Sequence, residues 1–370
     1  MIRILHVIRK MDFGGAETLL MNIYRNIDRK AVQFDFAVQT NEKGLFDDEI
    51  ESLGGRIFHI PDFYVTNFLQ YRRFWNKFLQ EHPEYKIIHG HVNSSAAVYL
   101  SCAKRNKRIA IVHSHATRGR INSLRSLMFL IFSYPIRYIA DYFYGCSLQA
   151  GIDRFGSRVA HSDRFSVLNN GIQVEKFEYN AKTREKIRKE LNIDDATYLL
   201  GHVGRFQFAK NHDFLIDVFS ELHKREPQSK LLLIGDGELR KPIQKKVEDL
   251  GLVDAVIFGG LTDKVHEYLQ AMDCFVFPSI FEGLGISLIE AQTAGLPCIV
   301  SDAIVDEADI KAGLIVKHKL TDSPAIWADT IQGKKHHERR ITTDYIRSAG
   351  FDIKDTANIL SMAYMEKLNL

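Results

Sequence analysis

Strand-like and helix-like runs alternate along most of this chain. An apolar run at 3–8 is followed by residues 16–27, where Leu19, Leu20, Ile23 and Ile27 share one helix face. The same order repeats to residue 113, at 32–38, 45–53, 56–60, 68–79, 86–89, 94–104 and 109–113. Strands that alternate with helices pair in parallel, and the helices cover both faces of the sheet. The first half of the chain therefore predicts a doubly wound α/β domain.

A second block of the same kind begins after residue 195. Asn169-Asn170-Gly171 is a turn signal, and a charged stretch separates it from the next strand at 198–203. Helices are predicted at 213–222 and 238–250, and strands at 230–234, 255–258, 274–277 and 297–300. A chain of 370 residues suits two domains of ordinary size. We predict an N-terminal domain at 1–172 and a C-terminal domain at 173–350.

The end of the chain predicts a separate helix. Within 351–370 the apolar residues recur at helical spacing, which predicts an amphipathic helix that packs on a domain, with the N-terminal domain as a candidate: Ile353, Ala357, Leu360, Tyr364 and Leu368. The longest apolar cluster, 127–132, is too short to cross a bilayer, and the N-terminus lacks the pattern of a signal peptide. The four cysteines form no C-x-x-C pair. These features predict a cytoplasmic protein with reduced thiols.

Two loops carry groups that suit an anion, because ligands of such sheets bind beyond the carboxyl ends of the strands. Gly14 and Gly15 follow the first strand and open a helix, which suits a phosphate, although an ordinary tight turn is the simpler explanation of two glycines alone. Arg205 and Lys210 lie on the corresponding loop of the second domain. A forked guanidinium and a mobile ammonium suit a diphosphate, although surface cations are common.

The most informative segment lies between Glu282 and Glu290. A strand ends at Phe277, a glycine-rich turn follows at 283–286, and a helix begins. Backbone N–H groups of such a turn suit a phosphate or a sugar hydroxyl, and carboxylates accept hydrogen bonds from sugar hydroxyls. The alternative is two unrelated acids, one of them favoured by the dipole at a helix N-terminus. The glycine-rich setting favours the functional interpretation.

Together with Val203-Gly204-Arg205, Lys210-Asn211, Ile234-Gly235-Asp236-Gly237 and Gly14-Gly15-Ala16-Glu17, this segment resembles glycosyltransferase family 4. Residues 168–172 and 290–297 narrow the resemblance to the EpsF-like group of bacterial exopolysaccharide and capsule glycosyltransferases. The resemblance implies the GT-B fold, an α/β fold of two Rossmann-like doubly wound domains that face a central cleft. It implies a retaining transfer of a hexosyl or related group from a nucleotide-sugar, by default a UDP-sugar. The implied acceptor is a glycan or a lipid-linked glycan in surface polysaccharide biosynthesis.

The resemblance also implies roles for single residues. Arg205 and Lys210 would hold the donor diphosphate, Glu290 the ribose and Glu282 the donor sugar. The remaining donor contacts would come from Gly15, Phe258 at the base, and the backbone of Gly283, Leu284, Gly285 and Ile286. His113 matches the family's active-site histidine, and it joins Glu282, Arg205 and Lys210 as the catalytic set. The family uses no metal and no cofactor, and a two-step mechanism with Glu282 as nucleophile stays open.

Histidines and basic residues leave two further alternatives. His89, His91, His113 and His115 form two H-x-H pairs, which suit a metal, yet no Asp, Glu or Cys joins them nearby. We therefore expect no metal. The stretch 104–137 is basic and has no acidic residue, and Ile121, Leu124, Met128 and Ile131 share a helical face.

A basic amphipathic element of this kind suits an anionic membrane surface, such as the inner face of the plasma membrane. A helix packed in the core explains the same pattern equally well. No recognised nucleic-acid motif is present, so we expect no nucleic-acid partner.

Two other functions compete with a transferase. One is another GT-B enzyme, either an epimerase, which the glycine-rich setting of Glu282 and Glu290 disfavours, or a phosphorylase, which the short chain and the lack of a cofactor-lysine context disfavour. The other is a non-catalytic binding protein, which has no need of the four charged residues assigned to the donor site.

Overall fold

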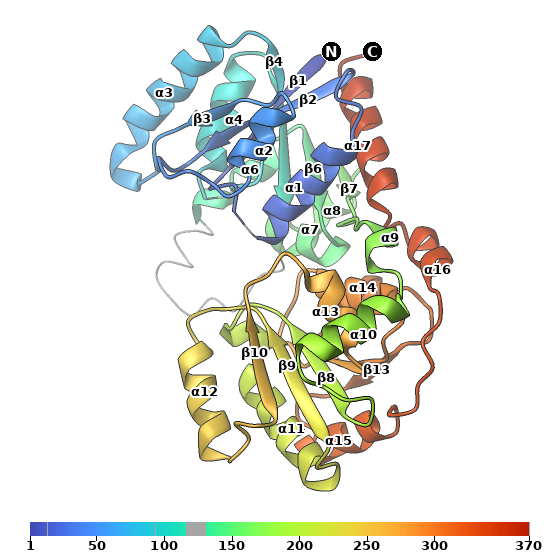
Figure 1. Cartoon of the computed structure of the whole chain (residues 1–370). Helices are drawn as coiled ribbons and strands as arrows, with labels where there is room; N and C mark the ends of the chain where they lie inside the picture. The colour runs from blue at the N-terminus through green and yellow to red at the C-terminus, as the bar shows by residue number, and fades with distance from the viewer. Residues whose placement is uncertain (13, 93, 116–130, 370) are drawn as a thin grey trace. The chain divides into compact units, whose positions relative to one another are not determined.

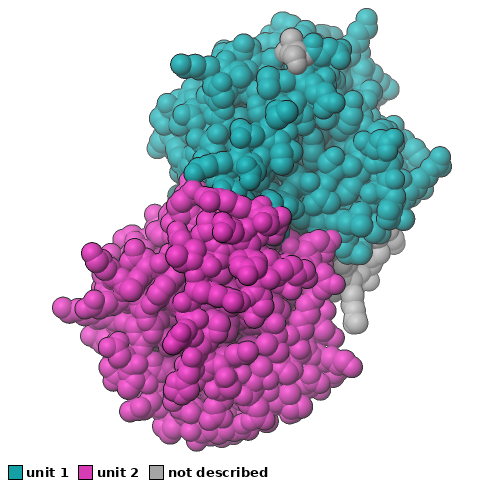
Figure 2. Space-filling view, turned by 90° about the vertical axis from the view of Figure 1, so that its right-hand side faces the viewer, with its two compact units in different colours: residues 1–172, 350–370 teal, residues 173–349 magenta. Residues whose placement is uncertain are grey.

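The computed structural model describes residues 1–12, 14–92, 94–115 and 131–369 (Figure 1). They form two compact units, coloured separately in Figure 2. Unit 1 comprises residues 1–172 and 350–370, and unit 2 comprises residues 173–349. The chain leaves unit 1 and returns to it at one place. There the Ile172 N–H donates to the Phe351 carbonyl at 2.8 Å, and the Ile353 N–H donates to the Ile172 carbonyl at 3.0 Å.

Unit 1 is built on a parallel sheet with the strand order β3-β2-β1-β4-β5-β6-β7. Its strands are β1 Ile2–Ile8, β2 Val32–Val38, β3 Ile57–His59, β4 Tyr85–Gly90, β5 Ile109–Ser114, β6 Tyr142–Gly145 and β7 Phe165–Val167. Its helices are α1 Gly15–Asn26, α2 Asp47–Ser52, η1 Val65–Asn67, α3 Phe68–Glu81, α4 Ala96–Arg105, α6 Ile136–Ile139, α7 Leu148–Phe155, α8 Ser157–Ala160 and α17 Ile353–Lys367. The first five strands match those predicted from the sequence. The last two were missed because runs of three or four residues show no clear period.

Unit 2 repeats this design with the strand order β10-β9-β8-β11-β12-β13. Its strands are β8 Tyr198–Val203, β9 Ser229–Ile234, β10 Val256–Gly260, β11 Cys274–Phe277, β12 Cys298–Ser301 and β13 Ile315–His318. Its helices are α9 Val174–Phe177, α10 Ala181–Glu190, η2 Phe208–Lys210, α11 His212–Arg225, α12 Arg240–Asp249, α13 Val265–Ala271, α14 Ile286–Thr293, η3 Asp306–Ala308, α15 Pro324–Gln332 and α16 Thr343–Ser348. The sequence missed β13, in which three residues are partly buried and Lys317 is exposed.

Apolar side chains bury both faces of the sheet in unit 1. Leu5 and Val7 of β1 pack in one core with Trp75 and Leu100, and the alternate residue Ile4 packs in the other core with α1 and α17. In α17 the predicted face is buried, with Ile353, Ala357, Leu360 and Tyr364 each at most 1% exposed. The terminal helix therefore forms part of the core of unit 1.

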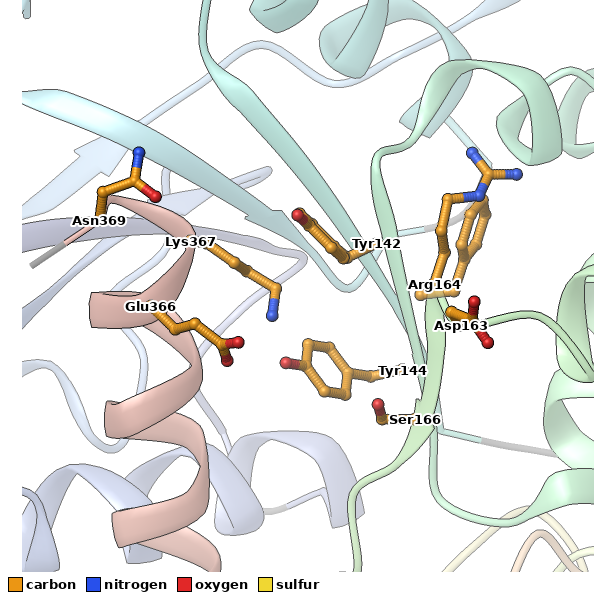
Figure 3. A pocket seen from close by; sticks show the side chains of 9 residues that line it. Tyr142, Tyr144, Asp163, Arg164, Ser166, Glu366, Lys367 and Asn369 are labelled. Atoms are coloured by element: carbon orange, nitrogen blue, oxygen red, sulfur yellow. The ribbon is translucent and has the colours of Figure 1, made fainter.

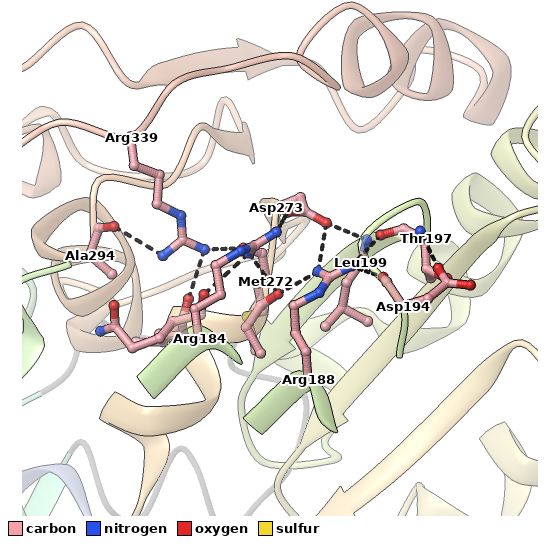
Figure 4. A network of polar contacts seen from close by, with 12 residues as sticks. Arg184, Arg188, Asp194, Thr197, Leu199, Met272, Asp273, Ala294 and Arg339 are labelled. Atoms are coloured by element: carbon pink, nitrogen blue, oxygen red, sulfur yellow. Dashed lines mark hydrogen bonds and ion pairs between the residues drawn. The ribbon is translucent and has the colours of Figure 1, made fainter. Parts of the chain in front are cut away.

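One polar network ties the start of unit 2 to its sheet (Figure 4). The Asp273 carboxylate accepts from Arg184 at 2.6 Å, from Arg188 at 3.2 Å and from the Leu199 N–H at 2.7 Å. Arg339 donates to the Met272 carbonyl beside it. Arg188 is 2% exposed, and both of its terminal nitrogens donate hydrogen bonds, so the network holds α10 against β8 and β11.

Each sheet has one point where the strand order reverses direction. The neighbouring strands are β1 and β4 in unit 1, and β8 and β11 in unit 2. Ligands of open parallel sheets bind outside the carboxyl ends of the strands at such a point. The loops that leave these four strands are therefore where a site is expected.

Candidate active site

A largely buried ion pair joins the two loops at the switch point of unit 2. Lys210 Nζ, from η2 after β8, donates to Glu282 Oε1 at 2.5 Å. Only 15% of the Lys210 side chain and 11% of the Glu282 side chain are exposed. The Lys210 ammonium also lies 4.8 Å from the centre of the Phe277 ring, where the ring face favours a cation. The structure thus brings together two of the catalytic residues predicted from the sequence.

Arg205 lies on the same loop but in a different environment. Its side chain is 69% exposed and lies 3.6 Å from the Glu238 carboxylate, which is 60% exposed. An exposed pair of this kind holds neither side chain firmly. Arg205 is therefore available to an incoming anion, whereas Lys210 is already engaged with Glu282.

The backbone around Arg205 requires the glycines of the predicted motif. A Cβ on Gly235, whose φ is +134°, would lie 2.2 Å from the Gly204 carbonyl oxygen. A Cβ on Gly237 would lie 2.5 Å from the Phe206 carbonyl oxygen. These two glycines let the β9 loop pack against the Arg205 loop, so the close approach of two backbones explains them.

The glycine-rich turn after β11 leads directly into α14. Gly285 is the N-cap of this helix with φ +84°, a conformation that favours glycine, and no side chain caps the helix. Ile286 is partly buried, and Leu284 is 3% exposed with its side chain in the core. Gly283 and Gly285 have no side chain to offer. The donor contacts predicted for Gly283 to Ile286 would therefore come from backbone N–H groups. These groups lie at the N-terminus of α14, which suits an anion.

Glu290 lies within α14 and is only partly exposed. Burial raises the pKa of its carboxyl to about 8, and the positive charge of Lys176 opposes that rise. A carboxyl in this setting gains from any ligand that donates hydrogen bonds to it. Phe258 is on β10, partly buried, with its ring 6.1 Å from the Phe206 ring and 6.0 Å from the Arg240 guanidinium.

In unit 1, Gly15 begins α1 after the loop that leaves β1. A Cβ built on Gly15 would meet no atom of the described residues within 4 Å, so their packing does not require glycine here. Gly14 differs, because a Cβ there would meet the Glu17 carboxylate at 2.2 Å. An open position at a helix start is compatible with a ligand that approaches the backbone.

His113 lies one residue before the end of β5, in a cluster of imidazoles. It is 1% exposed, and its ring centre lies 4.0 Å from that of His115, 5.6 Å from that of His91 and 5.7 Å from that of His89. Burial lowers the pKa of His113 well below its usual value, so the ring is neutral at pH 7.

The four histidines noticed in the sequence do lie together. The structure adds His6 of β1, which sequence reasoning missed, and Tyr364 of α17, which was predicted only as part of a helix face. Nitrogen atoms within two groups of three lie within 4.8 Å of one another: His6, His89 and His91, and His91, His113 and His115. Both groups contain histidine only. The four histidines are therefore neighbours in space as well as in sequence pattern.

The basic stretch 104–137 is only partly described. Lys104 pairs with Asp141, and the Arg137 guanidinium lies 3.9 Å from the centre of the Tyr134 ring. Three of its basic residues and most of its predicted apolar face lie outside the described residues: Arg118, Arg120, Ile121, Leu124, Arg125 and Met128. Among the described helices, none combines the length and the apolar character needed to cross a bilayer.

A cavity of about 400 Å³ lies elsewhere in unit 1 (Figure 3). It lies between β6, β7 and the end of α17, and its lining includes Tyr144, Ser166 and Glu366. None of the site residues predicted from the sequence lines it.

Comparisons with known sequences agree with this picture. A family model described as "Glycosyl transferases group 1" matches residues 183–313. EpsF of Bacillus subtilis, which is named as a glycosyltransferase, is 33% identical over 98% of this chain and 96% of its own length. CapH of Staphylococcus aureus, named as a capsular polysaccharide biosynthesis glycosyltransferase, is 26% identical over 99% of both chains.

Solved structures show the same fold at lower identity. HepE of Anabaena, solved in complex with UDP, superposes with a TM-score of 0.81 at 19% identity and covers 99% of this chain and 100% of its own. WaaG, a glycosyltransferase involved in lipopolysaccharide biosynthesis, superposes with a TM-score of 0.71 at 17% identity and covers 97% of this chain and 95% of its own. The GT-B fold predicted from the sequence is confirmed.

Proposed function

Because this chain belongs to the group 1 glycosyl transferases, we propose that it is a retaining enzyme that moves a sugar from a UDP-sugar to a glycan or lipid-linked glycan acceptor. The acceptor would be an intermediate of surface polysaccharide synthesis, the process in the name of CapH. UDP is the proposed nucleotide because HepE, which shares the fold, was solved with UDP and with UDP-glucose. A transferase is favoured over an epimerase and over a non-catalytic binding protein.

The Lys210–Glu282 ion pair carries this proposal. A diphosphate bound at the N-terminus of α14 would find a cation held in place by a carboxylate, with Arg205 free to fork onto a second oxygen. Charge that develops on the leaving phosphate would then be neutralised without a metal ion. We therefore propose a metal-independent reaction that requires no cofactor.

The same pair supports one role for Glu282 over another. A carboxylate bound to an ammonium at 2.5 Å is a poor nucleophile, because the lone pairs needed for attack are already stabilised. Glu282 is better suited to accept a hydrogen bond from a hydroxyl of the donor sugar. The leaving phosphate can take the acceptor's proton, so we favour a one-step retaining reaction over a two-step one.

Binding at the membrane surface is a second part of the proposal. The basic residues of 104–137 would contact anionic headgroups near a lipid-linked acceptor, on the cytoplasmic side. Co-sedimentation with vesicles that contain phosphatidylglycerol tests it. We expect binding at low salt that high salt weakens. Absence of binding at low salt would contradict this part alone.

Calorimetry tests the donor assignment. UDP, GDP and ADP are titrated in the presence of a chelator into the wild type and into the double variant Arg205→Ala/Lys210→Ala. We expect UDP to bind and the double variant to lose about 100-fold in affinity, since two charge-assisted contacts disappear. Arg225→Ala/Lys245→Ala is the control, because it removes the same two charges from exposed ion pairs of unit 2. Failure of all three nucleotides to bind the wild type would contradict the proposal.

A further inference from the structure

The cavity of Figure 3 lies at the amino ends of two strands of unit 1. Tyr142 is the first residue of β6, and Arg164 directly precedes β7. The end of α17 forms the other wall and supplies Glu366 and Lys367. Ligands of open parallel sheets bind beyond the carboxyl ends of the strands. This cavity is at the opposite edge, so it is separate from the switch point of unit 1. Its volume of about 400 Å³ is in the range of small-molecule sites.

Lys367 enters the cavity without a carboxylate partner. Its Nζ lies 4.2 Å from the centre of the Tyr142 ring, and none of the described residues forms an ion pair with it. Burial lowers the pKa of Lys367, and the negative charge of Glu366 opposes that change. A partly desolvated nitrogen that lacks a hydrogen-bond partner gains from any ligand that accepts a hydrogen bond from it.

Tyr144 brings a second donor to the same space. The residue is 4% exposed, and its ring centre lies 5.7 Å from that of His89 and 5.9 Å from that of His113. Its hydroxyl lines the cavity and has no hydrogen-bond partner among the described residues. Burial raises the pKa of this phenol to about 12, and the negative charge of Glu366 adds to the rise. The hydroxyl is therefore protonated at pH 7 and can donate one hydrogen bond and accept another.

The rest of the lining is polar, and its charges balance. Two basic and two acidic side chains line the cavity: Lys367, Arg164, Glu366 and Asp163. Ser166 and Asn369 add an uncharged hydroxyl and an amide. Figure 3 shows the Glu366 carboxylate, the Lys367 nitrogen and the Tyr144 hydroxyl pointing into one space. A ligand there meets a cation that only donates and a carboxylate that only accepts.

These groups suit an uncharged polyhydroxyl ligand better than a charged one. A hydroxyl group can accept from Lys367 and donate to Glu366. A phosphate or carboxylate would be attracted by Lys367 but repelled by Glu366, and a cation would meet the opposite difficulty. A zwitterionic amino acid matches these two charges, but it has no hydroxyl groups for the uncharged part of the lining. A sugar ring carries several hydroxyl groups and can satisfy both kinds of partner.

We propose that the cavity between β6, β7 and α17 is a second sugar-binding site, in which Lys367, Glu366 and Tyr144 hold one uncharged sugar residue through its hydroxyl groups. Glu366 and Ser166 are exposed, so the cavity is open to a sugar that belongs to a longer chain. That chain is the glycan of the acceptor. This last identification rests on the proposed function, whereas the sugar binding does not.

Fluorine NMR of the full-length protein labelled with 3-fluorotyrosine reports on the cavity directly. The Tyr144 resonance is assigned through its loss in Tyr144→Phe. Methyl α-glucoside, methyl α-galactoside and methyl N-acetyl-α-glucosaminide are titrated separately. We expect at least one of them to shift the Tyr144 resonance until the shift saturates. Absence of a saturable shift with all of these sugars would overturn the proposal.

A double variant tests the two residues of α17. Glu366→Ala/Lys367→Ala should weaken binding of that sugar at least about tenfold, since two hydrogen bonds to charged groups disappear. Saturation-transfer NMR, which detects the sugar, measures the affinity. Lys77→Ala/Glu81→Ala is the matched control, because it removes the same two charges from an exposed pair of α3 in the same unit. Equal affinities in the double variant and the control would overturn the proposal.

A milder variant keeps the test valid if the double variant is unstable. Tyr144→Phe removes one hydroxyl and no charge, and it should weaken sugar binding about two- to tenfold in the same measurement. Unchanged affinity would show that this hydroxyl does not hold the sugar.

Two charged probes separate the proposal from its alternatives. Inorganic phosphate and glycine are titrated under the same conditions, and we expect neither to match the sugar. Tighter binding of phosphate would establish an anion site, and tighter binding of glycine an amino-acid site, and either result would overturn the proposal. Calorimetry with UDP tests the donor assignment separately. Sugar binding in the cavity without UDP binding would count against the donor assignment and leave the second sugar site standing.

Discussion

The two switch points of this molecule carry different chemistry at corresponding places. In unit 2 the loops after β8 and β11 bring a lysine and a glutamate together as an ion pair. In unit 1 the ends of β1, β4 and β5 bring neutral histidines together. The Lys210 cation and the uncapped N-terminus of α14 thus both lie in unit 2, where a diphosphate is proposed to bind. Unit 1 offers uncharged donors, which suit hydroxyl groups without attracting anions at long range.

Even the shared features differ in their consequences. The first strand of each unit carries a buried histidine, His6 in β1 and His202 in β8. His202 Nδ1 donates to the Val276 carbonyl, so this hydrogen bond joins β8 to β11 and passes to no further side chain. His6 Nδ1 lies 3.0 Å from His91 Nε2, so the ring nitrogen of His6 that carries the proton decides whether His91 donates or accepts there. The buried histidine of unit 2 thus bonds to the backbone, whereas that of unit 1 bonds to His91, which bonds in turn to His115.

Among the changes that test this comparison, loss of Lys210 should have the largest effect on turnover. We expect Lys210→Ala to lower turnover about 10²- to 10³-fold, because it removes a charge aimed at the leaving phosphate. Glu282→Gln should have a smaller effect, because the amide can still accept a hydrogen bond. Turnover of the nucleotide-sugar found by calorimetry measures both. Lys246→Ala is the control, since Lys246 pairs with Asp213 and Asp217 on the helix surface. Turnover of Lys210→Ala within threefold of the wild type would contradict the assigned role.

The pH dependence of stability should have opposite signs in the two units. The pKa of Glu290 is raised from 4.5 to about 8, so the folded state binds the proton more tightly. Its contribution is present below pH 4.5 and is lost as the pH rises to 8, by at most about 1.4 kcal/mol per pH unit. Glu290→Gln should remove this slope. Urea unfolding from pH 5 to 8, with hydrogen exchange to report on unit 2, measures the difference.

For His6 the sign is reversed. Its pKa is lowered from 6.5 to about 3, so the unfolded chain binds the proton more tightly. The contribution is present above pH 6.5 and is lost as the pH falls toward 3, again by at most about 1.4 kcal/mol per pH unit. His6→Asn should lose less stability on acidification than the wild type. Equal slopes for both proteins below pH 6.5 would mean that His6 is not neutral and buried as described.

Much of the fold was predictable because it depends on local patterns. Strands 3–8 and 198–203 and the terminal helix stand out by periodicity, and each of them forms. The short strands β6, β7 and β13 could not be predicted, since their pairing is decided by neighbours far along the chain. The network at Asp273 was missed for the same reason, because Arg184 and Asp273 meet only after the sheet has formed.

The residues of the candidate site likewise fall into those that local sequence reveals and those that it does not. Charged residues on glycine-containing loops, such as Lys210 and Glu282, are visible in the sequence because loops seldom need them for packing. The place of His6 in the histidine cluster was not predicted, because a single histidine in an apolar strand is usually a core residue. Tyr364 was predicted as a core position of a helix, which it is. Its bond to His89, a residue 275 positions away, has no local signal.

The smallest effect we predict tests how firmly unit 1 holds its histidines. Tyr364→Phe removes a hydroxyl 2.5 Å from His89 Nδ1 and leaves a buried ring nitrogen without that partner. We expect a loss of about 1–2 kcal/mol in the unfolding free energy of unit 1. The matched control is Tyr144→Phe, which removes a tyrosine hydroxyl from the same unit. The Tyr144 side chain lines the cavity of Figure 3. Its hydroxyl has no hydrogen-bond partner among the described residues, so its loss should cost less than 0.5 kcal/mol, as for ordinary substitutions. Equal losses in the two variants would mean that the tyrosine ring, and not the hydrogen bond to His89, anchors α17.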